Sequence, residues 1–360
     1  MKISIIGSRG IPALYGGYET FCEKIFPELQ RCGNEVLIIG EKDNFVLHEN
    51  KLPSKYLNFN KSENPLKYYH KSIKESISWG ADKIIMCGVG GVFSAIYYSN
   101  KIEFYVNPDG LEFRRAKWSL FKRFFIFVQY LFCALFIENI ICDSQGIKTY
   151  YSKKFNRKKN LFVAEYGTEL DDSSEKTNNK SEFNIPSRLN DYFLIVSRLE
   201  PENNVKMMIE GYIESKSEKN LIIVGKLDTE HAQNLIKYKS PRIKFLNGVY
   251  EKSHLKALRK HAFAHLHGHS VGGTNPSLLE AMGAANLILA HRNSFNEAIL
   301  NSDGYYFSSS KELSLIIREI ESIKSSILKK KSQNNYFKAK ENYTWEIIGV
   351  KYNQILENGI

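Results

Sequence analysis

Short apolar segments alternate with longer amphipathic ones along this chain, and the alternation runs through two successive series. The short segments have the length and the branched, apolar composition of buried strands, whereas the longer ones repeat apolar residues at helical spacing. Strands that alternate with helices pair in parallel, because each helix returns the chain to the same edge of the sheet. The pattern therefore predicts an α/β fold built on parallel sheets.

In the first series we predict strands at Lys2–Ile6, Glu35–Ile39, Lys83–Cys87, Glu103–Val106, Asn139–Cys142 and Leu161–Ala164. The helices of this series are predicted at Tyr18–Arg31, Leu66–Ser78, Lys117–Phe136 and Gln145–Phe155. In the second series we predict strands at Phe193–Ser197, Asn220–Val224, Arg242–Leu246, Phe263–His267 and Asn286–Ala290. Its helices are predicted at Asn204–Ser215, Ser253–Lys260, Pro276–Gly283 and Lys311–Lys329, followed by a last helix at Thr344–Leu356.

The segment Leu170–Asn190 is rich in Asp, Ser, Asn, Lys and Glu and poor in large apolar residues, which predicts a linker between the two series. Residues 1–168 and 169–343 would then form two Rossmann-like domains, and residues 344–360 a C-terminal helix. Ligands of such sheets bind beyond the carboxyl ends of the strands. We therefore expect the two domains to face each other across a cleft that holds the functional site.

The charge balance narrows the class of partner. The chain has 50 basic and 39 acidic residues, a formal net charge of +11 at pH 7, which favours a polyanion, an anionic membrane surface or a phosphate-bearing substrate. No uncharged apolar run reaches the length of about 18 residues that a membrane-spanning helix needs. The apolar start is too short for a secretory signal, so a cytoplasmic location is expected. The five cysteines lack C-x-x-C spacing, so we expect free thiols, without a disulfide framework or a cysteine zinc site.

The first predicted strand leads into Gly7-Ser8-Arg9-Gly10-Ile11-Pro12-Ala13-Leu14-Tyr15-Gly16-Gly17. Glycine lets the backbone approach a ligand closely, and amides at the start of the next helix form an anion site. The spacing differs from the dinucleotide fingerprint, and the lack of G-K-[ST] excludes a Walker loop. The alternative is a glycine loop needed only for its turn. Gly88-Val89-Gly90-Gly91 is a second, weaker cluster, because such turns often carry glycine for steric reasons.

Asp109 and Glu112 follow the predicted strand Glu103–Val106, which would point a carboxylate into the cleft. A carboxylate there can accept a proton or a hydrogen bond from an acceptor hydroxyl. In the alternative, Asp109-Gly110 is a turn and Glu112 caps the helix that begins at Lys117. The residues themselves favour neither interpretation.

The next segment, Trp118–Cys142, and the residues just before it combine basic and aromatic side chains. Such a combination at the start of a helix is typical of contact with an anionic bilayer surface. We expect that contact for the Arg114–Lys122 end and burial for the apolar part, Val128–Ile137. The alternative is a buried helix whose basic end is solvated.

In the second series, Arg198 lies where a strand ends and a helix opens, within Ser197-Arg198-Leu199-Glu200-Pro201-Glu202-Asn203-Asn204-Val205. A guanidinium group there can hold a diphosphate, with the helix N-terminus assisting. The alternative is a surface arginine paired with Glu200 or Glu202.

The stretch His265–Met282 places a strand, a glycine-rich loop and a helix in order, so amides at Thr274–Ser277 are expected to form an anion site. Glu280, about one turn into that helix, is placed to accept hydrogen bonds from ribose hydroxyls. Three histidines alternate along the extended segment, at His265, His267 and His269. No nearby acidic residue or cysteine completes a metal-ligand set, so we expect one histidine at the substrate and the others packed. The lack of a G-x-S-x-G elbow argues against a serine hydrolase.

Taken together, these motifs resemble the bacterial rhamnosyltransferases of glycosyltransferase family 4, over essentially the whole chain. The resemblance is carried by Gly-Ser-Arg-Gly-Ile-Pro…Tyr-Gly-Gly-Tyr-Glu-Thr, Asp-Gly-Leu-Glu-Phe-Arg-Arg-Ala-Lys-Trp, Arg-Leu-Glu-Pro-Glu-Asn-Asn and His-Ser-Val-Gly-Gly-Thr-Asn-Pro-Ser-Leu-Leu-Glu-Ala-Met. It implies the GT-B fold and a nucleotide-sugar donor bound mainly by the C-terminal domain. It also implies a C-terminal helix that crosses back to the first domain, which Thr344–Leu356 matches.

The resemblance also implies roles for residues. Gly16 and Gly17 would approach the donor phosphates or sugar, Arg198 would hold the diphosphate, and Glu280 would bind the ribose. The implied catalytic residues are Asp109, Arg198 and His269, with Asp109 assigned by its place. The implied donor-binding residues are Gly16, Gly17, Arg198, Gly273, Thr274, Asn275, Pro276, Ser277 and Glu280. Gly272 stands where the family has its first motif glutamate, which fits an altered sugar, and Asn203 stands near the usual diphosphate lysine.

The implied reaction is a retaining transfer without metal or other cofactor. Arg198 and helix amides would stabilise the diphosphate leaving group, and a phosphate oxygen of that group would take the acceptor's proton. The implied donor is dTDP-rhamnose, and the implied acceptor is a polyprenyl-diphosphate-linked oligosaccharide of O-antigen or capsule synthesis. Such an enzyme would be cytoplasmic and peripheral on the inner face of the bacterial membrane.

Other functions remain as alternatives. A family 4 glycosyltransferase could use a UDP-sugar instead, and a nucleotide-sugar epimerase shares the two-domain fold but gives no reason for the basic, aromatic helix after Asp109. A NAD-dependent dehydrogenase is disfavoured because the fingerprint glycines are missing. A nucleic-acid-binding protein is disfavoured because the lysines are scattered and do not gather on one face.

Overall fold

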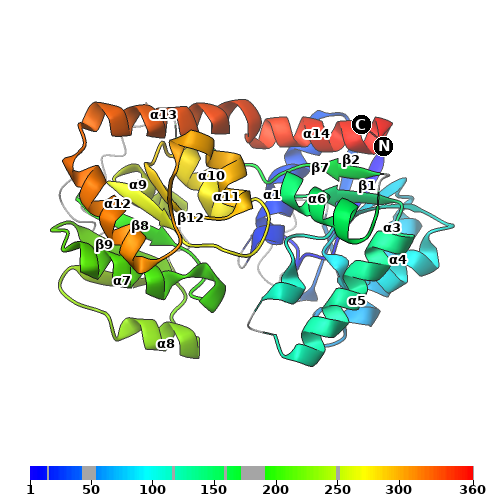
Figure 1. Ribbon diagram of the computed structural model, residues 1–360. Helices are drawn as coiled ribbons and strands as arrows, with labels where there is room; N and C mark the ends of the chain where they lie inside the picture. The colour runs from blue at the N-terminus through cyan, green and yellow to red at the C-terminus, as the bar shows by residue number, and fades with distance from the viewer. Residues whose placement is uncertain are drawn as a thin grey trace. The chain divides into compact units, whose positions relative to one another are not determined.

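The computed structural model describes residues 1–13, 16–42, 54–115, 118–157, 160–171, 191–248 and 252–359. The chain divides into two compact units, each an α/β unit of its own (Figure 1). Unit 1 comprises Met1–Gly167 together with Trp345–Ile360, and unit 2 comprises Thr168–Thr344. Most of the predicted linker, residues 170–190, lies outside the described residues.

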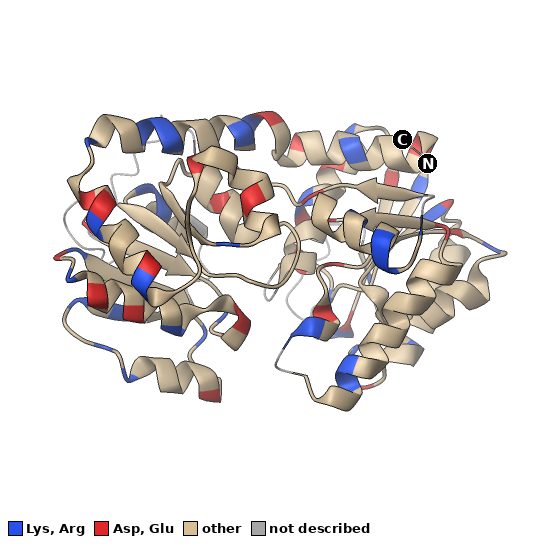
Figure 2. Ribbon diagram, in the orientation of Figure 1, with Lys and Arg blue, Asp and Glu red and all other residues tan. Residues whose placement is uncertain are grey.

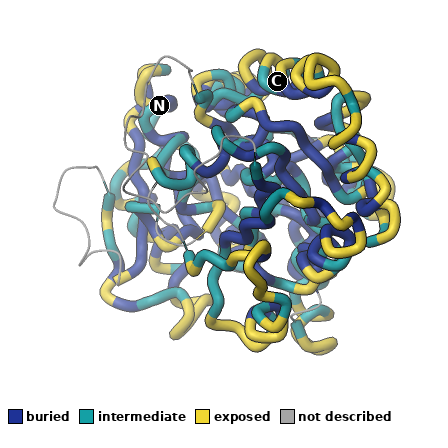
Figure 3. The backbone as a smooth tube through the Cα atoms, turned by 90° about the vertical axis from the view of Figure 1, so that its left-hand side faces the viewer, coloured by how far each residue is buried: buried dark blue, intermediate teal, exposed yellow. Residues whose placement is uncertain are grey.

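Unit 1 is built on a seven-stranded parallel sheet in the order β3-β2-β1-β4-β5-β6-β7. Its strands are β1 (Lys2–Ile6), β2 (Glu35–Gly40), β3 (Ser54–Tyr56), β4 (Lys83–Cys87), β5 (Glu103–Asn107), β6 (Asn139–Cys142) and β7 (Leu161–Val163). The central strands are buried (Figure 3) because helices cover both faces of a doubly wound sheet. The strand order reverses between β1 and β4, which defines a switch point at their carboxyl ends.

The helices of unit 1 are α1 (Gly17–Arg31), α3 (Pro65–Trp79), α4 (Val92–Tyr98), α5 (Leu120–Phe136), α6 (Gln145–Lys154) and α14 (Trp345–Asn358). Their starts follow from local chemistry, because the side chains of Asn64, Ser119 and Ser144 each accept a backbone N–H in the first turn of α3, α5 and α6. Single-turn 3₁₀ helices occupy Val89–Gly91 and Glu112–Arg114.

The C-terminal helix α14 belongs to unit 1, as expected from the resemblance, and packs on α1. Gly349 permits the close approach, since a Cβ there would lie 2.3 Å from the Cβ of Glu28. Phe21 of α1 contacts Trp345 and Tyr352, with ring centroids 6.5 and 5.1 Å apart. Helix α14, which follows unit 2 in the sequence, thus completes the core of unit 1.

Unit 2 is built on a six-stranded parallel sheet in the order β10-β9-β8-β11-β12-β13. Its strands are β8 (Tyr192–Val196), β9 (Asn220–Gly225), β10 (Ile243–Asn247), β11 (Ala264–His267), β12 (Ile288–His291) and β13 (Tyr305–Phe307). Its helices are α7 (Val205–Ser215), α8 (Glu230–Ile236), α9 (Lys252–Lys260), α10 (Pro276–Gly283), α11 (Ser294–Leu300), α12 (Ser310–Ser322) and α13 (Ser325–Asn342), with 3₁₀ turns at Pro201–Asn203 and Asn301–Asp303. The switch point of this sheet lies between β8 and β11.

Two parallel α/β units are therefore confirmed, and each predicted strand is present with ends within two residues of the prediction. The single helix predicted at residues 311–329 is wrong. Ile323 and Lys324 are extended, with ψ of 145° and 129°, so α12 ends at Ser322 and α13 begins at Ser325. Partly buried Ile323 packs against the core of unit 2, which fixes the break.

Several short elements were not predicted, namely β3, β13, α4, α8 and α11. Both strands are three residues long and lie at the edges of their sheets, where a strand has little apolar periodicity. The free cysteines agree with expectation, because four are buried and Cys32 is half-buried. Within the described ranges, no helix has the length and apolar character needed to span a membrane.

Candidate functional site

The glycine loop after β1 lies at the switch point of unit 1. Gly7 has φ of +94°, and a Cβ there would lie 2.4 Å from the carbonyl oxygen of Cys87 in β4, so glycine is required for the turn. Two carboxylates of α1 hold the loop: Glu19 Oε1 accepts the N–H of Arg9 at 3.0 Å, and Glu23 Oε2 accepts that of Ala13 at 2.7 Å. The loop is thus fixed from the helix that follows it.

Gly17 differs from Gly7, because the fold of unit 1 does not require glycine there. A Cβ on Gly17 would lie 3.7 Å from the hydroxyl oxygen of Tyr166, which is ordinary contact. Gly16 is the N-cap of α1 with extended φ of −158°, but a Cβ there would lie 2.8 Å from Oε2 of Glu19. Both residues are exposed at the start of a helix of 15 residues. Contacts within unit 1 therefore explain glycine at residues 7 and 16 and do not explain it at residue 17.

The second cluster, Gly88 to Gly91, has a packing explanation. A Cβ on Gly91 would lie 2.3 Å from the Tyr69 ring, and one on Gly90 would lie 3.0 Å from it. Gly88 has φ of +85° and donates its N–H to the carbonyl of Asn107 at 2.7 Å. Steric need accounts for these glycines without a ligand.

Asp109 lies just beyond the carboxyl end of β5 in a tight turn, with φ of +61°. Its N–H donates to Asn107 Oδ1 at 2.9 Å, and two tyrosine hydroxyls hold the adjacent backbone. Tyr18 donates to the Asn107 carbonyl at 2.9 Å, and Tyr130 donates to the Pro108 carbonyl at 2.8 Å. The pKa values of Tyr18, Tyr130 and Tyr166 are all raised, mainly by burial and secondly by the negative charge of Asp109. Asp109 therefore lies in a turn and also within a buried polar cluster.

Glu112 does not cap α5, so that interpretation is wrong. Ser119 is the N-cap, and its side chain accepts the N–H of Lys122. The Glu112 carboxylate accepts the indole N–H of Trp118 at 2.9 Å and pairs with Arg115 at 2.5 Å. Through these contacts Glu112 holds in place the segment that leads into α5.

Arg198 follows β8 at the switch point of unit 2. Its side chain is exposed, and among the described residues no carboxylate pairs with it, neither Glu200 nor Glu202. Its carbonyl accepts the Asn203 side-chain N–H at 2.7 Å. Asn203 is 2% exposed, and this hydrogen bond holds the backbone of the Arg198 loop in place.

The N-terminus of α10 meets the Arg198 loop, because the Ser277 hydroxyl donates to the Val196 carbonyl at the end of β8 at 2.8 Å. Asn275 caps the helix by accepting the Ser277 N–H at 3.0 Å, and Pro276 has no N–H to donate. An anion bound here would therefore rely on the N–H groups of Gly273, Thr274 and Asn275. Of residues 274–277, therefore, only Thr274 and Asn275 have an N–H left for an anion.

Gly272 has φ of +130°, a conformation that an L-amino acid with a side chain rarely adopts. A Cβ there would meet nothing within 4 Å, so space is not the constraint. The backbone itself disfavours a glutamate at this position.

The three histidines of β11 and its loop have different environments. His265 and His267 are 0% and 1% exposed, whereas His269 is half-buried and stacks on His267 with centroids 4.5 Å apart. Burial lowers the pKa of His267 to about 3 and that of His265 well below its usual value. The expected packing of two of the histidines is thus present at His265 and His267, and the contact of His269 with a substrate stays a prediction. Within the described part of the chain, no three His, Cys, Asp or Glu side chains are grouped to hold a metal ion.

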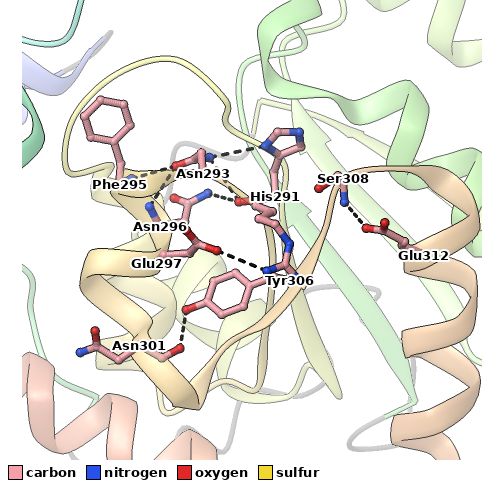
Figure 4. A network of polar contacts seen from close by, with 10 residues as sticks. His291, Asn293, Phe295, Asn296, Glu297, Asn301, Tyr306, Ser308 and Glu312 are labelled. Carbon is pink, nitrogen blue, oxygen red and sulfur yellow. Dashed lines mark hydrogen bonds and ion pairs between the residues drawn. The ribbon is translucent and has the colours of Figure 1, made fainter.

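The backbone of His269 is held by two asparagines of the β12–α11 region. Asn293 and Asn296 donate side-chain N–H groups to the His269 carbonyl at 3.0 and 3.3 Å. Both also donate to the His291 carbonyl, at 3.2 and 2.8 Å (Figure 4). Asn293 is in addition the N-cap of α11. This carboxamide clamp, Asn293 with Asn296, fixes the loop that carries His269.

Glu280 is partly exposed, with 39% of its side chain accessible, and forms an ion pair with Arg259 of α9. The Arg259 side chain is only 9% exposed. The pair joins Glu280 Oε2 to a guanidinium N–H of Arg259. One carboxylate oxygen is thus held by the protein, and the pair orients the other.

Arg198, the His269 loop and the α10 N-terminus thus lie at the carboxyl edge of the sheet of unit 2, with Glu280 about one turn into α10, whereas Gly16, Gly17 and Asp109 lie at the carboxyl edge of the sheet of unit 1. Sequence reasoning missed Arg259, Asn293 and Asn296, because their role depends on contacts between elements distant in sequence. It also missed Asp143, which follows β6 and is 1% exposed. An acidic residue directly after an apolar strand was the available signal for Asp143.

Comparison with known proteins identifies the fold. Residues 1–44 and 65–169 match a family profile described as Domain of unknown function (DUF1972), which spans less than half of the chain. No curated protein sequence matches the chain.

Solved structures match over almost the full length. Sucrose-phosphate synthase from Thermosynechococcus elongatus has a TM-score of 0.81 at 13% identity, covering 99% of this chain and 98% of that one. A glycosyltransferase from Rickettsia africae ESF-5 has 0.75 at 17% identity, covering 99% of each chain. Anabaena Alr3699/HepE in complex with UDP-glucose has 0.77 at 16% identity, again covering 99% of each. The chain therefore has the GT-B fold, as the resemblance implied.

Proposed function

We propose that this protein is a glycosyltransferase that moves a sugar from a nucleotide diphosphate sugar to an oligosaccharide acceptor, with retention of anomeric configuration. One observation carries the proposal: Arg198, which has no carboxylate partner among the described residues, and the N-terminus of α10 lie at the switch point of unit 2, and the carboxylate of Glu280 lies about one turn into the same helix. An arginine and a helix N-terminus bind a diphosphate, and a carboxylate accepts hydrogen bonds from the hydroxyls of a ribose. The full-length likeness to Anabaena Alr3699/HepE, whose structure was solved with UDP-glucose, supports this assignment.

In this proposal Arg198 neutralises the diphosphate as it leaves. Because its guanidinium is exposed and has no carboxylate partner among the described residues, it is available to the ligand without breaking an ion pair. The N–H groups of Gly273, Thr274 and Asn275 add donors aimed at the same anion. Preorganised donors of this kind stabilise charge that develops in the transition state. The proposed reaction includes no metal or other cofactor, since these groups balance the leaving charge.

Glu280 binds the ribose through the oxygen that Arg259 does not hold, and the His269 loop lines the donor sugar. The carboxamide clamp holds that loop from behind, so the loop is in place before the donor binds. Pro276 and Ser277 contribute by starting α10 and by fastening it to β8. These roles assign every implied donor-binding residue of unit 2.

In unit 1, Gly16 and Gly17 approach the donor, and Asp109 lies on the acceptor side. The absence of a fold requirement for glycine at residue 17 supports this role, because a ligand would then be what excludes a side chain. The acceptor hydroxyl attacks from the face that the diphosphate leaves, and a phosphate oxygen takes its proton. Asp109 accepts a hydrogen bond from the acceptor.

For the donor we propose dTDP-L-rhamnose. Gly272, where family 4 relatives have a glutamate that contacts the sugar, supports a sugar with altered hydroxyl positions, and its φ of +130° shows that the loop conformation is adapted to glycine. A UDP-sugar is the second candidate, favoured by the UDP-glucose complex of Anabaena Alr3699/HepE.

For the acceptor we propose a polyprenyl-diphosphate-linked oligosaccharide of O-antigen or capsule synthesis, reached at the inner face of the membrane. Helix α5 supports membrane contact because basic residues lie in its first turns (Figure 2) and exposed apolar side chains lie among them. Leu120 and Phe121 are each 81% exposed and Phe124 is 65% exposed. Lys122 lies over the Trp118 ring at 3.6 Å. An apolar surface next to cationic side chains fits an anionic bilayer.

The expected burial of residues 128–137 holds only on one face of α5. Tyr130, Cys133 and Ala134 are buried, whereas Leu135 and Phe136 are 57% and 56% exposed. The helix turns one face to the core, and its apolar residues are exposed near both ends and half-buried between them.

Membrane contact is tested by co-sedimentation with phosphatidylglycerol and phosphatidylcholine vesicles. We expect binding to the anionic vesicles only, and its loss in a Phe121→Ser, Phe124→Ser double variant. A Leu315→Ser, Phe337→Ser double variant removes apolar residues of unit 2 that are 54% and 53% exposed and serves as the matched control. Equal binding by both double variants would remove α5 from the membrane contact.

The activity is tested first by ligand-induced thermal stabilisation with dTDP, UDP, GDP, NAD and a short RNA at fixed salt. A ligand at 100 times its Kd adds about 2.7 kcal/mol to the stability of the native state, which is readily detected. A larger shift with dTDP than with UDP supports the rhamnosyl donor, and the reverse supports the UDP-sugar. A shift with NAD or RNA alone would overturn the proposal. Conversion of the donor sugar to its epimer without acceptor would assign the epimerase instead.

A further inference from the structure

Tyr166, shortly after β7, carries a hydroxyl group to which the proposed function gives no role. The residue is 4% exposed, and among the described residues its hydroxyl makes no hydrogen bond. Other tyrosines of unit 1 differ, because Tyr56, Tyr68 and Tyr130 each donate to a main-chain carbonyl at 2.7–2.8 Å. A polar group that is largely removed from water normally has a hydrogen-bond partner. The Tyr166 hydroxyl is therefore available to a ligand.

The hydroxyl end of Tyr166 faces the start of α1. A Cβ on Gly17 would lie 3.7 Å from the hydroxyl oxygen of Tyr166 and 3.9 Å from the nearest ring carbons. Phe21, one turn further along α1, packs edge-on against the ring, with centroids 6.0 Å apart and an interplanar angle of 79°. This contact fixes the ring. Because Gly17 is exposed, the hydroxyl lies beside a surface that a ligand can reach.

The first turn of α1 supplies further donors at the same place. Gly16 is the N-cap and has no side-chain oxygen, so no side chain caps the first-turn N–H groups. These N–H groups and the Tyr166 hydroxyl belong to elements far apart in the sequence, and both lie beside Gly17. A ligand oxygen at this position can accept hydrogen bonds from both.

The acidic groups around this position favour an uncharged ligand over a phosphate. Glu19, in the first turn of α1, is 8% exposed, and its Oε1 accepts the N–H of Arg9 at 3.0 Å. Glu23 Oε2 accepts the N–H of Ala13 at 2.7 Å. Two carboxylates thus occupy loop N–H groups that a phosphate oxygen would otherwise use. A phosphate would also be repelled by these negative charges.

Basic side chains of the same loop region are engaged within unit 1. Arg9 Nε lies 3.4 Å from Glu41 Oε1, and Lys61 Nζ donates to the Gly7 carbonyl at 2.7 Å. A phosphate bound here would have to compete with these partners for the cations. A sugar hydroxyl avoids that cost, because it can accept from the N–H and O–H donors and can donate to a carboxylate.

We propose that Tyr166 is a sugar-binding residue, whose hydroxyl donates a hydrogen bond to a hydroxyl oxygen of an uncharged sugar that lies against Gly17 at the start of α1. The inference rests on the proposed function, since it specifies that this part of unit 1 binds a sugar and not a phosphate. Burial raises the pKa of Tyr166, so the hydroxyl keeps its proton at neutral pH. Donor and acceptor both carry sugar hydroxyls, and the binding experiment distinguishes them.

The first test is the stability of Tyr166→Phe, which removes only the hydroxyl. Because no described protein group bonds to this hydroxyl, the midpoint of urea-induced unfolding should stay unchanged or rise. Tyr192→Phe is the matched control, since the buried Tyr192 hydroxyl donates to the Leu258 carbonyl at 2.6 Å and its loss should lower the midpoint. A fall for Tyr166→Phe as large as that for Tyr192→Phe would overturn the proposal, because the protein itself would then use the hydroxyl.

The second test is binding, by calorimetry with UDP, UDP-glucose, dTDP and dTDP-L-rhamnose and by saturation-transfer NMR with methyl hexopyranosides. Tyr166→Phe should raise the Kd of a sugar-bearing ligand about three- to tenfold, as expected for the loss of one neutral hydrogen bond. The Kd of the bare nucleotides should not change, and Tyr192→Phe should change none of these values. A change confined to nucleotide sugars assigns the hydroxyl to the donor sugar, and a change in the methyl hexopyranosides assigns it to the acceptor sugar.

Two binding results would overturn the proposal. An equal loss of affinity for bare UDP or dTDP would assign the hydroxyl to a phosphate, and unchanged affinity for every sugar ligand would show that no sugar uses it. If the natural chain binds UDP or dTDP while Tyr166→Phe changes nothing, the proposed function stands and this inference alone fails. A natural chain that binds neither a nucleotide nor a sugar would overturn both.

Discussion

Replacement of Glu280 by glutamine separates the two roles that the structure gives this carboxylate. Glu280→Gln keeps the size of the side chain but removes the charge that faces both Arg259 and the proposed ribose. A hydrogen bond to a charged group contributes about 1.5–3 kcal/mol, so its loss should weaken nucleotide binding roughly 10- to 150-fold. We expect this loss in the Kd of whichever nucleotide, dTDP or UDP, binds the natural chain.

The same substitution should lower the stability of unit 2. Breaking a fully buried ion pair costs about 3–5 kcal/mol, whereas an exposed pair contributes about 0–1 kcal/mol. Because Arg259 is 9% exposed and Glu280 39%, we expect an intermediate loss of about 1–2 kcal/mol. Urea-induced unfolding followed by a probe in unit 2 measures it.

Arg259→Met is the matched control. It breaks the same ion pair but leaves the Glu280 carboxylate, so stability should fall while nucleotide affinity changes by less than about threefold, or 0.7 kcal/mol. Isothermal titration calorimetry on both variants distinguishes the roles. If Glu280→Gln binds nucleotide as tightly as the natural chain, Glu280 serves only Arg259 and the ribose assignment is refuted.

Four further perturbations test the remaining roles. Arg198→Ala should reduce sugar transfer at least 100-fold, about 2.7 kcal/mol, with little change in unfolding midpoint, because the side chain is exposed; a comparable loss of stability would point to a structural role. Gly17→Ala should fold normally but weaken donor binding in calorimetry, and unchanged binding would show that no ligand approaches there. Asn293→Asp keeps the cap of α11 but loses the N–H group that donates to the His269 carbonyl. We expect the KM for the nucleotide sugar to rise, and an unchanged KM would count against the carboxamide clamp. Burial lowers the pKa of His265 and His267, so the folded state binds fewer protons than the unfolded state. Unit 2 should therefore lose stability as pH falls below about 6.5. His267→Phe should reduce that loss when unfolding is measured against pH.

The sequence alone determined the two parallel sheets and the places where ligands can bind. Apolar strands such as β1 and β8 bury both faces, so they appear as short apolar runs, and the residues that follow them must lie at the carboxyl edge. Arg198, Asp109 and the glycine loop were found for that reason. Short edge strands such as β13 were missed because their periodicity is weak.

Only the tertiary structure decided which of these residues are free to act. It showed that Gly90 and Gly91 are explained by the Tyr69 ring and Gly17 is not, a difference that depends on a side chain from another element. It paired Glu280 with Arg259 across helices. Such a contact joins residues far apart in the sequence, and no local pattern encodes it. The proposed ribose contact of Glu280 depends on this pairing.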